Sequence, residues 1–528
     1  MGKLDQRETP IFSNLKNEYA ARKIAPFHVP GHKQGRGIDK EFYDFIGPNI
    51  FKIDVTIFEM VDGLHYPKSH IKKALELTAE TFGAQESFFT VNGTSGGIQA
   101  MILSAIKPGE KILVPRNIHI SVSAGIILGG ATPVYMQPEI DPVNGIAHGV
   151  SPETVRQTLL QHPDASAVLV INPTYYGIAT DLVSIVNIVH GYDIPLLVDE
   201  AHGPHLQFAD DLPISAMEAG ADACTQSTHK LTGALTQGSI LHIQGDLIQG
   251  NRVRQVLNIL QSTSPSYPLL ASLDVARKQV ALDGESLIGQ AIRNAKWLRG
   301  EINIISGMHC FGEEVLDRQG VFAFDPTKIS VSAKTLGLTG FQLEKILTTE
   351  YNIQVELSDF YNVLFITSYA DSKDDLKTVQ HALRAISAQY TPLAHKGDVP
   401  AVNYLSTTPR MLDNPREAFF AVKTKCQLNE AIGKKSGESI MVYPPGIPIL
   451  YPGEEITEDI IHYIEMLKST NVSVQGLEDS SLEYINIIED YAVCPVASMP
   501  PPVQDCSDVI EQSPSNTEVF EPAIMNTG

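Results

Sequence analysis

The segment Pro195-Leu196-Leu197-Val198-Asp199-Glu200-Ala201-His202-Gly203 decides how the rest of this chain is interpreted. It begins as a short apolar run and stops abruptly on a carboxylate. That pattern is typical of a buried parallel strand whose C-terminal end carries functional groups. We therefore expect Asp199 to stand at the end of a central strand.

A second segment, Ser227-Thr228-His229-Lys230, places a lysine after small and polar residues in glycine-containing surroundings. An acid at a strand end with a lysine further along the chain indicates pyridoxal 5′-phosphate (PLP) chemistry. In that chemistry Lys230 would form the Schiff base. Asp199 would keep the pyridine nitrogen protonated, so that the ring can accept electrons.

Strands and helices alternate along the chain around these segments. Apolar strand patterns at 111–115, 132–136, 167–171 and 195–198 are separated by helical patterns at 121–128, 150–162 and 182–190. Such alternation predicts an α/β fold with a mostly parallel sheet, helices on both faces and functional groups at the carboxyl ends of the strands. Five residues follow predicted strand ends, and one crevice would collect them: Asn92, His119, Pro173, Asp199 and Lys230.

The segment Asn92-Gly93-Thr94-Ser95-Gly96-Gly97 joins a predicted strand to a predicted helix. Backbone N–H groups at the start of that helix, together with the hydroxyls of Thr94 and Ser95, suit a phosphate group. The segment is neither a G-x-G-x-x-G nor a Walker motif, so the nucleotide-binding patterns are not met.

Histidines in two segments have more than one interpretation. His119, at a strand end, could stack on a cofactor ring, bind a metal or cap a helix. No H-x-x-x-H or H-E-x-x-H spacing accompanies it, and the five cysteines are scattered without a C-x-x-C pair, so we expect no metal site. His28 and His32 lie in a loop that has either a chemical role or only a mixed surface character.

Composition and charge narrow the class of protein. The chain is 43% hydrophobic and 19% charged, without a run of apolar residues long enough to span a membrane. The N-terminus lacks the apolar region of a signal peptide, so we expect the cytoplasm. A net charge of −22 argues against a nucleic-acid-binding surface. Residues 471–528 hold ten acidic residues and no Lys or Arg.

At 528 residues the chain is too long for one ordinary core, so we expect several domains. The patterns predict an N-terminal arm at 1–50, a PLP-binding major domain at 51–299, a small α+β domain at 300–390, a C-terminal domain at 391–475 and an acidic, disordered tail at 476–528. Prolines between 442 and 454 exclude a helix or a central strand there.

Together the motifs resemble those of the fold-type-I, PLP-dependent ornithine/lysine/arginine decarboxylases, in the short form without an N-terminal receiver-like domain. The matching segments run in family order: His28-Val29-Pro30-Gly31-His32-Lys33, Asn92-Gly93-Thr94-Ser95-Gly96-Gly97, Arg116-Asn117-Ile118-His119, Asp199-Glu200-Ala201-His202-Gly203, Ser227-Thr228-His229-Lys230, Ser262-Thr263-Ser264-Pro265 and Tyr443-Pro444-Pro445-Gly446-Ile447-Pro448. The resemblance implies an aspartate aminotransferase-like major domain with smaller α+β domains.

The resemblance also implies roles for single residues. Lys230 would carry PLP, Asp199 would pair with the pyridinium nitrogen and His119 would stack on the ring. The phosphate would be bound by Thr94, Ser95 and Ser227. Ala201 would contact the cofactor, and His229 would act in proton transfer. Ser262 would reach the phosphate in the neighbouring subunit, which would make a homodimer, or a multiple of dimers, obligatory.

For the substrate, the resemblance implies a basic amino acid. We expect L-arginine, converted to agmatine and CO2 in polyamine biosynthesis, because short forms of this family are often biosynthetic arginine decarboxylases. A guanidinium needs a carboxylate partner. Glu454 is a candidate, unless it is a solvated charge in a turn, and His28 and His32 are further candidates for substrate contacts.

Two departures from the family pattern bear on the substrate. Ile120 stands where the family has a lysine after the stacking histidine, and the segment Val61 to Lys68 differs from the family's acidic turn. Lysine and ornithine therefore remain alternative substrates. Aminotransfer and β-elimination also occur on this fold, although a transaminase would need an arginine for the α-carboxylate and no motif for one is evident. The intact set of Lys230, Asp199 and His119 argues against an inactive relative that only binds.

Overall fold

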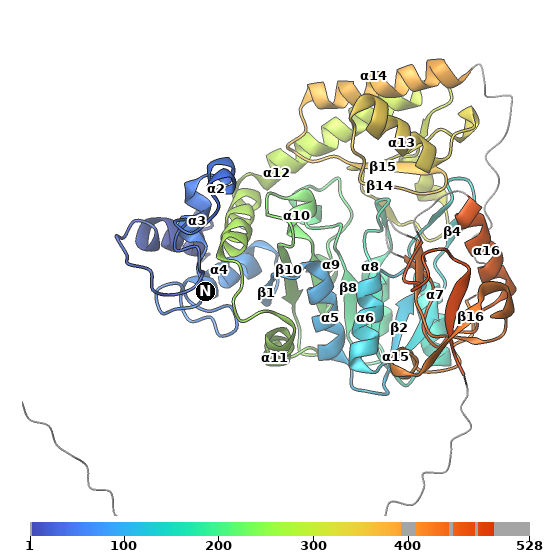
Figure 1. The fold of residues 1–528 in the computed structure, drawn as a ribbon, viewed down its shortest axis with the longest axis horizontal. Coiled ribbons are helices and arrows are strands. Elements are labelled where there is room, and N and C mark those ends of the chain that lie inside the picture. The colour runs from blue at the N-terminus through green and yellow to red at the C-terminus, as the bar shows by residue number, and fades with distance from the viewer. Residues whose placement is uncertain (1–2, 392–407, 443–446, 470–473, 490–528) are drawn as a thin grey trace, which may run out of the picture. The chain divides into compact units, whose positions relative to one another are not determined.

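The computed structural model describes residues 3–391, 408–442, 447–469 and 474–489. Its centre is a seven-stranded sheet in the order β1-β10-β9-β8-β6-β2-β3 (Figure 1). The strands are β1 (Glu86–Thr90), β2 (Lys111–Pro115), β3 (Thr132–Met136), β6 (Ala165–Ile171), β8 (Leu196–Asp199), β9 (Ala223–Gln226) and β10 (Ser239–Ile243). In this sheet β10 runs antiparallel to both neighbours, and the other six strands share one direction. The predicted α/β class with a mostly parallel sheet is confirmed.

Two layers of helices cover the sheet because the central strands are apolar on both faces. Leu169 and Leu197 pack against a layer formed by α5 (Gly93–Ala105), α6 (Ile120–Gly129) and α11 (Gly250–Leu260). Their neighbours Val168 and Val198 face the opposite layer, formed by α7 (Pro152–Gln161), α8 (Leu182–His190) and α9 (Ala216–Ala219). Successive side chains of a strand point to opposite faces, so a continuous apolar run fills both cores.

A smaller antiparallel sheet follows the long helix α12 (Tyr267–Asn303). Its order is β11-β13-β15-β14, with strands His309–Cys310, Lys328–Ser332, Asn362–Ile366 and Leu357–Ser358. Helices α13 (Gly340–Tyr351) and α14 (Lys373–Tyr390) share an apolar core with this sheet and with the end of α12. The boundary predicted at residue 299 therefore falls inside a continuous helix that serves both cores.

The C-terminal region contains two three-stranded sheets. One joins β16 (Lys423–Gln427), β21 (Tyr484–Ile488) and β17 (Lys435–Ser436). The other joins β19 (Ile447–Leu450), β18 (Ile440–Val442) and β20 (Val474–Gln475). Helices α15 (Pro415–Phe420) and α16 (Glu458–Ser469) also belong to the described part of this region. Pro448 stands on β19, an edge strand, as expected of a proline in a sheet.

Strand β21 corrects the tail boundary predicted at residue 476. It pairs with β16 and β17 and buries Ile485 and Ile487, so the folded chain continues at least to Ile488. The predicted disordered tail from 490 onward lies outside the described residues. So do residues 443–446 of the proline-containing motif and residues 392–407 of the predicted C-terminal domain.

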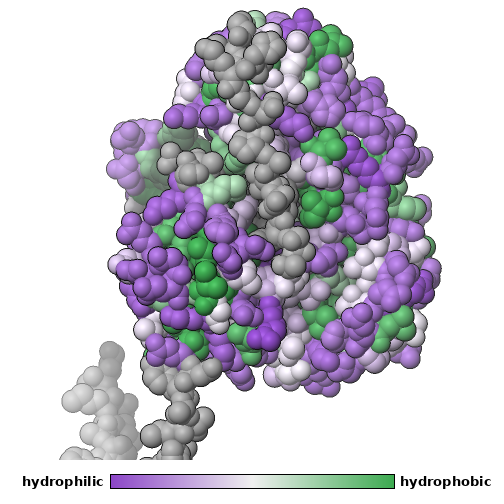
Figure 2. Space-filling model, turned by 90° about the vertical axis from the view of Figure 1, so that its right-hand side faces the viewer, coloured by the Kyte–Doolittle hydropathy of each residue, from purple (hydrophilic) through white to green (hydrophobic). Residues whose placement is uncertain are grey.

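The surface over the C-terminal region is mainly hydrophilic. Figure 2 shows that face with scattered small apolar patches among polar residues. In the part of the chain that the structure describes, no helix is both long enough and apolar enough to cross a membrane.

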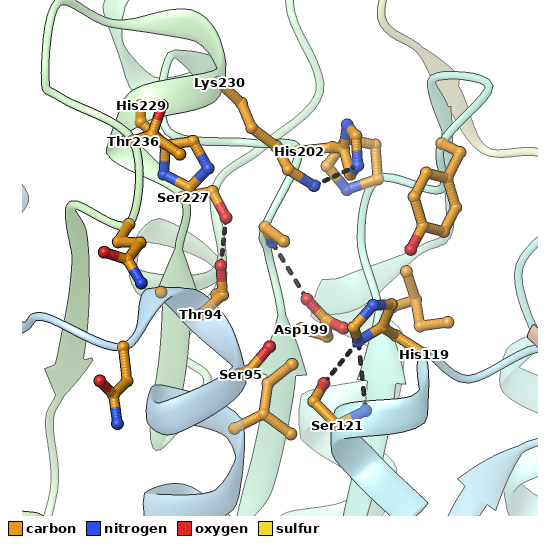
Figure 3. A pocket seen from close by; sticks show the side chains of 18 residues that line it. Thr94, Ser95, His119, Ser121, Asp199, His202, Ser227, His229, Lys230 and Thr236 are labelled. Atoms are coloured by element: carbon orange, nitrogen blue, oxygen red, sulfur yellow. Dashed lines mark hydrogen bonds between the residues drawn. The ribbon is translucent and has the colours of Figure 1, made fainter. Parts of the chain in front are cut away.

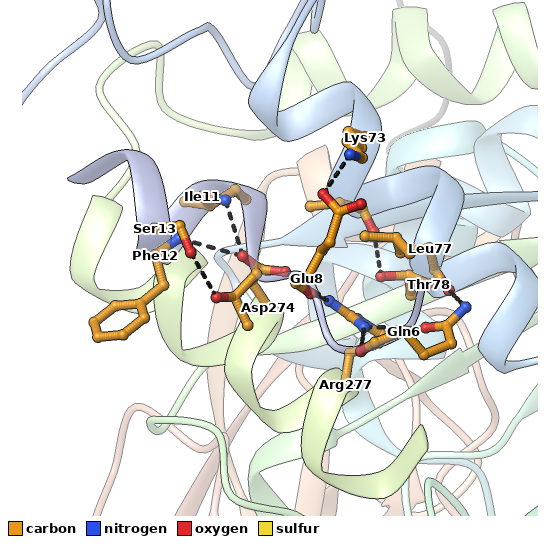
Figure 4. Close-up of polar contacts among 12 residues, drawn as sticks. Gln6, Glu8, Ile11, Phe12, Ser13, Lys73, Leu77, Thr78, Asp274 and Arg277 are labelled. Carbon is orange, nitrogen blue, oxygen red and sulfur yellow. Dashed lines mark hydrogen bonds and ion pairs between the residues drawn. The ribbon is translucent and has the colours of Figure 1, made fainter. Parts of the chain in front are cut away.

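A buried ion pair on α12 anchors the N-terminal arm (Figure 4). Arg277 and Asp274 lie 3.1 Å apart with both side chains fully buried. Arg277 donates to the backbone oxygen of Gln6 at 2.8 Å, and Asp274 accepts from the backbone N–H of Ile11 at 2.9 Å. The arm, with α1 (Pro10–Ser13), a π-helical turn (Asn14–Tyr19), α2 (Lys40–Ile46) and α3 (Pro48–Ile53), is thus tied to the start of α12 beside α4 (His70–Thr81).

Candidate active site

A cavity of about 290 Å³ opens at the carboxyl ends of the central strands (Figure 3). Eight of the predicted site residues line it: Thr94, Ser95, His119, Asp199, Ala201, Ser227, His229 and Lys230. They come from segments that follow β1, β2, β8 and β9. These side chains lie together because parallel strands have their carboxyl ends at the same edge of the sheet.

Lys230 lies on the short helix α10 (Thr228–Leu231), directly after β9. Its Nζ is 2.7 Å from Nε2 of His202 and 5.6 Å from the ring centre of Tyr175. Burial lowers the pKa of Lys230 to about 8, against the opposing charges of Asp199 and Glu356. The lysine is therefore still mainly protonated at neutral pH, but a far larger share of it is a neutral, nucleophilic amine than in an ordinary lysine.

Asp199 is the last residue of β8 and is buried. Its Oδ1 accepts a hydrogen bond from the backbone N–H of Ala201 at 3.1 Å. Burial raises the pKa of Asp199, and the Ala201 N–H and the charge of Lys230 act against that rise. Among the described residues no cationic side chain pairs with this carboxylate within ion-pair distance, which leaves it suited to a cationic group of a bound ligand.

Hydroxyl groups gather at the other end of the cavity. The side chains of Thr94, in the first turn of α5, and Ser227, at the start of α10, are hydrogen-bonded to each other, and Ser95 lies beside them. Gly93, with φ of 66°, starts α5 in a left-handed conformation that favours glycine. Hydroxyls at the N-terminus of a helix of this length form a suitable site for an anion such as a phosphate.

His119 caps α6 and presents a neutral ring to the cavity. Its Nδ1 accepts from the backbone N–H of Ser121 at 3.2 Å and lies 2.8 Å from the Ser121 hydroxyl. Burial, followed by the charge of Lys230, lowers the pKa of His119 to about 4. The ring is therefore flat, uncharged and fixed in orientation, as a stacking partner for a planar ligand would be.

Comparison with known proteins identifies the family. The description "Orn/Lys/Arg decarboxylase, major domain" matches residues 9–375, and "Orn/Lys/Arg decarboxylase, C-terminal domain" matches residues 401–481. The chain belongs to the Orn/Lys/Arg decarboxylase family. The predicted family and enzyme class, an amino-acid decarboxylase and hence a carbon–carbon lyase, are confirmed.

Relatives cover nearly the whole of this decarboxylase. The arginine decarboxylase of Bacillus subtilis (strain 168) is 46% identical over 487 residues, which span 92% of this chain and 99% of that protein. The constitutive lysine decarboxylase of Escherichia coli (strain K12) is 25% identical over 574 aligned residues, which span 89% of this chain and 79% of that protein.

The crystal structure of a Francisella novicida lysine decarboxylase superposes with a TM-score of 0.80 at 25% identity and covers 91% of this chain and 81% of that one. That similarity confirms the predicted fold-type-I architecture.

Three predicted residues of the decarboxylase lie away from the cavity in this protomer. His28 is 3.1 Å from the hydroxyl of Tyr19, and His32 is 3.1 Å from a carboxylate oxygen of Asp54. Ser262 is exposed in the loop after α11, where its hydroxyl accepts from the backbone N–H of Ser264 at 3.1 Å. None of the three lines the cavity.

Glu454 is neither a solvated charge nor a residue of the cavity. It is fully buried, and its two oxygens lie 2.6 Å and 2.9 Å from the guanidinium nitrogens of Arg116. The pairing uses both oxygens of the carboxylate inside the protomer. The carboxylate also accepts from the backbone N–H of Tyr451 at 2.8 Å, so it is engaged by this chain rather than open to a substrate guanidinium.

Sequence reasoning overlooked several residues of the cavity. His202 and Tyr175 are the ones with direct side-chain contacts to Lys230 or to each other, and Thr236 and Gln237 line the wall near His229. The signal was present for His202, which stands inside the Asp199 segment, and for Tyr175, which follows the strand end at Pro173.

Proposed function

We propose that this decarboxylase converts L-arginine to agmatine and CO2 with PLP bound in the cavity. The observation that carries the proposal is the meeting of Lys230, Asp199 and the hydroxyl cluster in one cavity. A nucleophilic amine, a buried carboxylate without a cationic partner and an anion site at a helix N-terminus match the aldehyde, pyridine nitrogen and phosphate of PLP.

Different residues of the cavity would bind different parts of the cofactor. Lys230 would attach the aldehyde carbon, Asp199 would hold a proton on the pyridine nitrogen, and His119 would contact the ring. The phosphate would be bound by Thr94, Ser95 and Ser227, and Ala201 would be a small residue beside the cofactor. PLP, when bound, would supply an electron sink for the electron pair left behind when CO2 departs.

His229 is the proposed donor of the proton that replaces the lost carboxylate. It precedes Lys230 and lines the same cavity, with Nδ1 3.0 Å from the backbone oxygen of Gly238. Burial lowers the pKa of His229. With Nδ1–H donating to that oxygen, Nε2 of the neutral ring carries no proton. Nε2 would first take one up, and the lowered pKa would then favour its transfer to the substrate carbon.

Two observations support arginine as the substrate. Four relatives at 45% to 47% identity are named arginine decarboxylases, whereas those named lysine decarboxylases are 25% identical. In addition, the charge of the exposed carboxylate of Glu356, just before β14, acts against the burial that lowers the pKa of both Lys230 and His229. A carboxylate within electrostatic reach of the cavity is the group that a guanidinium side chain would bind.

We further propose that the working enzyme is a homodimer or a multiple of dimers. Ser262 supports this because its hydroxyl is exposed and free of the protomer's own cavity, as a residue that serves a neighbouring subunit must be. Aminotransfer is the weaker alternative. No arginine is among the described residues that line the cavity, so a fixed partner for the α-carboxylate is not evident there.

The test is a substrate comparison on the purified full-length protein with PLP. CO2 release is measured with arginine, lysine and ornithine, and the amine product is identified by mass. Arginine is expected to give the highest kcat/KM, with agmatine as the product. Preference for lysine or ornithine would contradict the assigned substrate, and keto-acid formation without CO2 would contradict decarboxylation itself.

A further inference from the structure

His202 has no part in the roles assigned above, yet it makes the closest side-chain contact of Lys230. It lies three residues after the end of β8 and is 4% exposed. Its Nε2 is 2.7 Å from Nζ of Lys230 (Figure 3). The centre of its ring is 4.6 Å from that of Tyr175. The contact lies in the wall of the cavity, where His202 is buried and Lys230 is partly buried.

A buried ion pair of the small domain lies behind His202. Lys328, at the start of β13, lies 2.9 Å from Asp325, and both side chains are fully buried. The same lysine is 3.4 Å from the backbone oxygen of His202, and Asp325 is 3.0 Å from Nε2 of His205. The segment from 202 to 205 is therefore fixed from the opposite side of the cavity wall.

This surrounding keeps the imidazole of His202 neutral. Burial lowers the pKa of His202 well below its ordinary value, and the charges of Lys230 and Lys328 lower it further, while Asp325 acts in the opposite direction. A neutral imidazole carries one proton and offers one acceptor nitrogen. Nδ1 of His202 is buried and has no hydrogen-bond partner among the described residues.

The direction of the hydrogen bond decides what the contact does. If the amine of Lys230 accepted a hydrogen bond from Nε2–H, its lone pair would be occupied and could not attack a carbonyl carbon. If the amine donates an N–H to Nε2, the lone pair stays free. The second arrangement places the imidazole proton on Nδ1 and suits a nucleophile.

We propose that His202 is a positioning residue for Lys230, whose amine donates a hydrogen bond to Nε2 and is thereby held with its lone pair free to attack. This inference rests on the proposed function, because it takes Lys230 as the residue that attaches PLP. The charged groups that act on the Lys230 amine are Asp199, Glu356 and Lys328. Since His202 itself stays uncharged, it acts on the amine through the hydrogen bond alone.

The test measures the attachment of PLP rather than turnover. Full-length protein freed of cofactor is mixed with PLP at a series of pH values, and the rate of attachment is followed by absorbance. Borohydride reduction and peptide mapping then show that the label is on Lys230. The variants are His202→Gln, whose side-chain amide reaches the place of Nε2, and His202→Asn, whose amide reaches only the place of Nδ1. His190→Phe, which removes a histidine hydrogen-bonded to Asp222 outside the cavity, is the matched control.

The proposal expects a difference between the two amide variants. His202→Asn should slow attachment about tenfold at high pH, because an unheld amine samples unproductive orientations. Its rate profile should also shift to lower pH, because the ammonium form loses an acceptor. His202→Gln and His190→Phe should keep a rate within about threefold of the unchanged protein.

Two outcomes would overturn the inference. One would leave the proposed function intact, and the other would overturn it as well. Equal rates and equal pH profiles for His202→Gln, His202→Asn and the unchanged protein, with the label on Lys230, would overturn the role of His202 alone. A label on a residue other than Lys230 in the unchanged protein would overturn the proposed function together with it.

Discussion

Arg116 and Glu454 form a bidentate ion pair that connects the end of β2 to the C-terminal region, with nitrogen–oxygen distances of 2.6 Å and 2.9 Å. The guanidinium also lies against a stacked pair of aromatic rings, 4.8 Å from the centre of Tyr135 and 4.5 Å from that of Tyr451. Glu454 is fully buried and Arg116 nearly so. Arg116 stands three residues before His119, so the pair also fixes the start of a cavity segment.

Removal of one partner of this pair should destabilise the protein strongly. Glu454→Leu leaves the Arg116 charge buried without compensation and should lower the free energy of unfolding by about 3–5 kcal/mol. The double variant Arg116→Met/Glu454→Leu removes both charges and should recover much of that loss. Denaturant unfolding of the three proteins measures both quantities. A single variant as stable as the unchanged protein would show that the pair contributes nothing.

The cavity residues that could be predicted from the sequence all follow strand ends. Asp199, His119 and Lys230 were predictable because an apolar run that stops on a polar residue is a local signal, and the parallel topology then brings such ends together. The phosphate site was predictable for a related reason. Its hydroxyls stand at the start of a helix, and a helix start is fixed by neighbouring residues.

Glu454 could not be placed from the sequence because its partner is 338 residues away. A carboxylate in a proline-rich segment has the same local pattern whether it is solvated, binds a substrate or pairs with a distant arginine. The partners of His28 and His32 could not be predicted either, because polar side chains in a loop can form hydrogen bonds within the N-terminal arm as readily as with a substrate. The role predicted for Ser262 depends on a second subunit, which a single chain does not contain.

Replacement of the carboxyl group by an amide should lower kcat strongly at Asp199 but little at its neighbour Glu200. Asp199→Asn can no longer hold a proton on the pyridine nitrogen by charge, so kcat should fall by about 10²- to 10³-fold. Burial raises the pKa of Glu200 to about 8, so at neutral pH its carboxyl is mainly protonated and Glu200→Gln changes little charge. The buried amide of Gln226, which donates to Glu200 at 2.7 Å and has an unpartnered oxygen, can turn to accept from the new amide.

Steady-state kinetics of both variants with arginine measures this contrast. Glu200→Gln should keep kcat within about threefold of the unchanged enzyme, since its hydrogen bonds can be remade. Equal losses in the two variants would mean that general disturbance of the strand end, rather than the charge of Asp199, explains the effect.

The buried amine of Lys230 should make stability depend on pH. Its pKa is about 8 in the folded chain, whereas that of an ordinary lysine, as in the unfolded chain, is 10.5. Between these pH values the unfolded chain therefore binds more protons than the folded chain. Stability must then rise as pH increases through that range, by at most about 1.4 kcal/mol per pH unit, and the full penalty applies below it. Lys230→Met lacks this dependence.

The measurement is the difference in unfolding free energy between the unchanged chain and Lys230→Met, both without cofactor, from pH 7 to pH 10. Taking the difference cancels the titration of tyrosines and other lysines. As pH rises above about 8, the free energy of unfolding of the unchanged chain should increase relative to that of Lys230→Met. A difference that stays constant, or that moves in the opposite direction, would contradict the low pKa of Lys230.

Glu356 should govern affinity for the basic side chain of the substrate. Its exposed carboxylate acts electrostatically on both His229 and Lys230, although Glu356 is not among the described residues that line the cavity. Glu356→Gln keeps the shape but loses the charge, and KM for arginine should rise about five- to tenfold with a smaller change in kcat, because a charge-assisted hydrogen bond is weakened. Glu350→Gln, which neutralises an exposed carboxylate on α13, is the control. An unchanged KM in Glu356→Gln, or an equal rise in both variants, would show that another group binds the guanidinium.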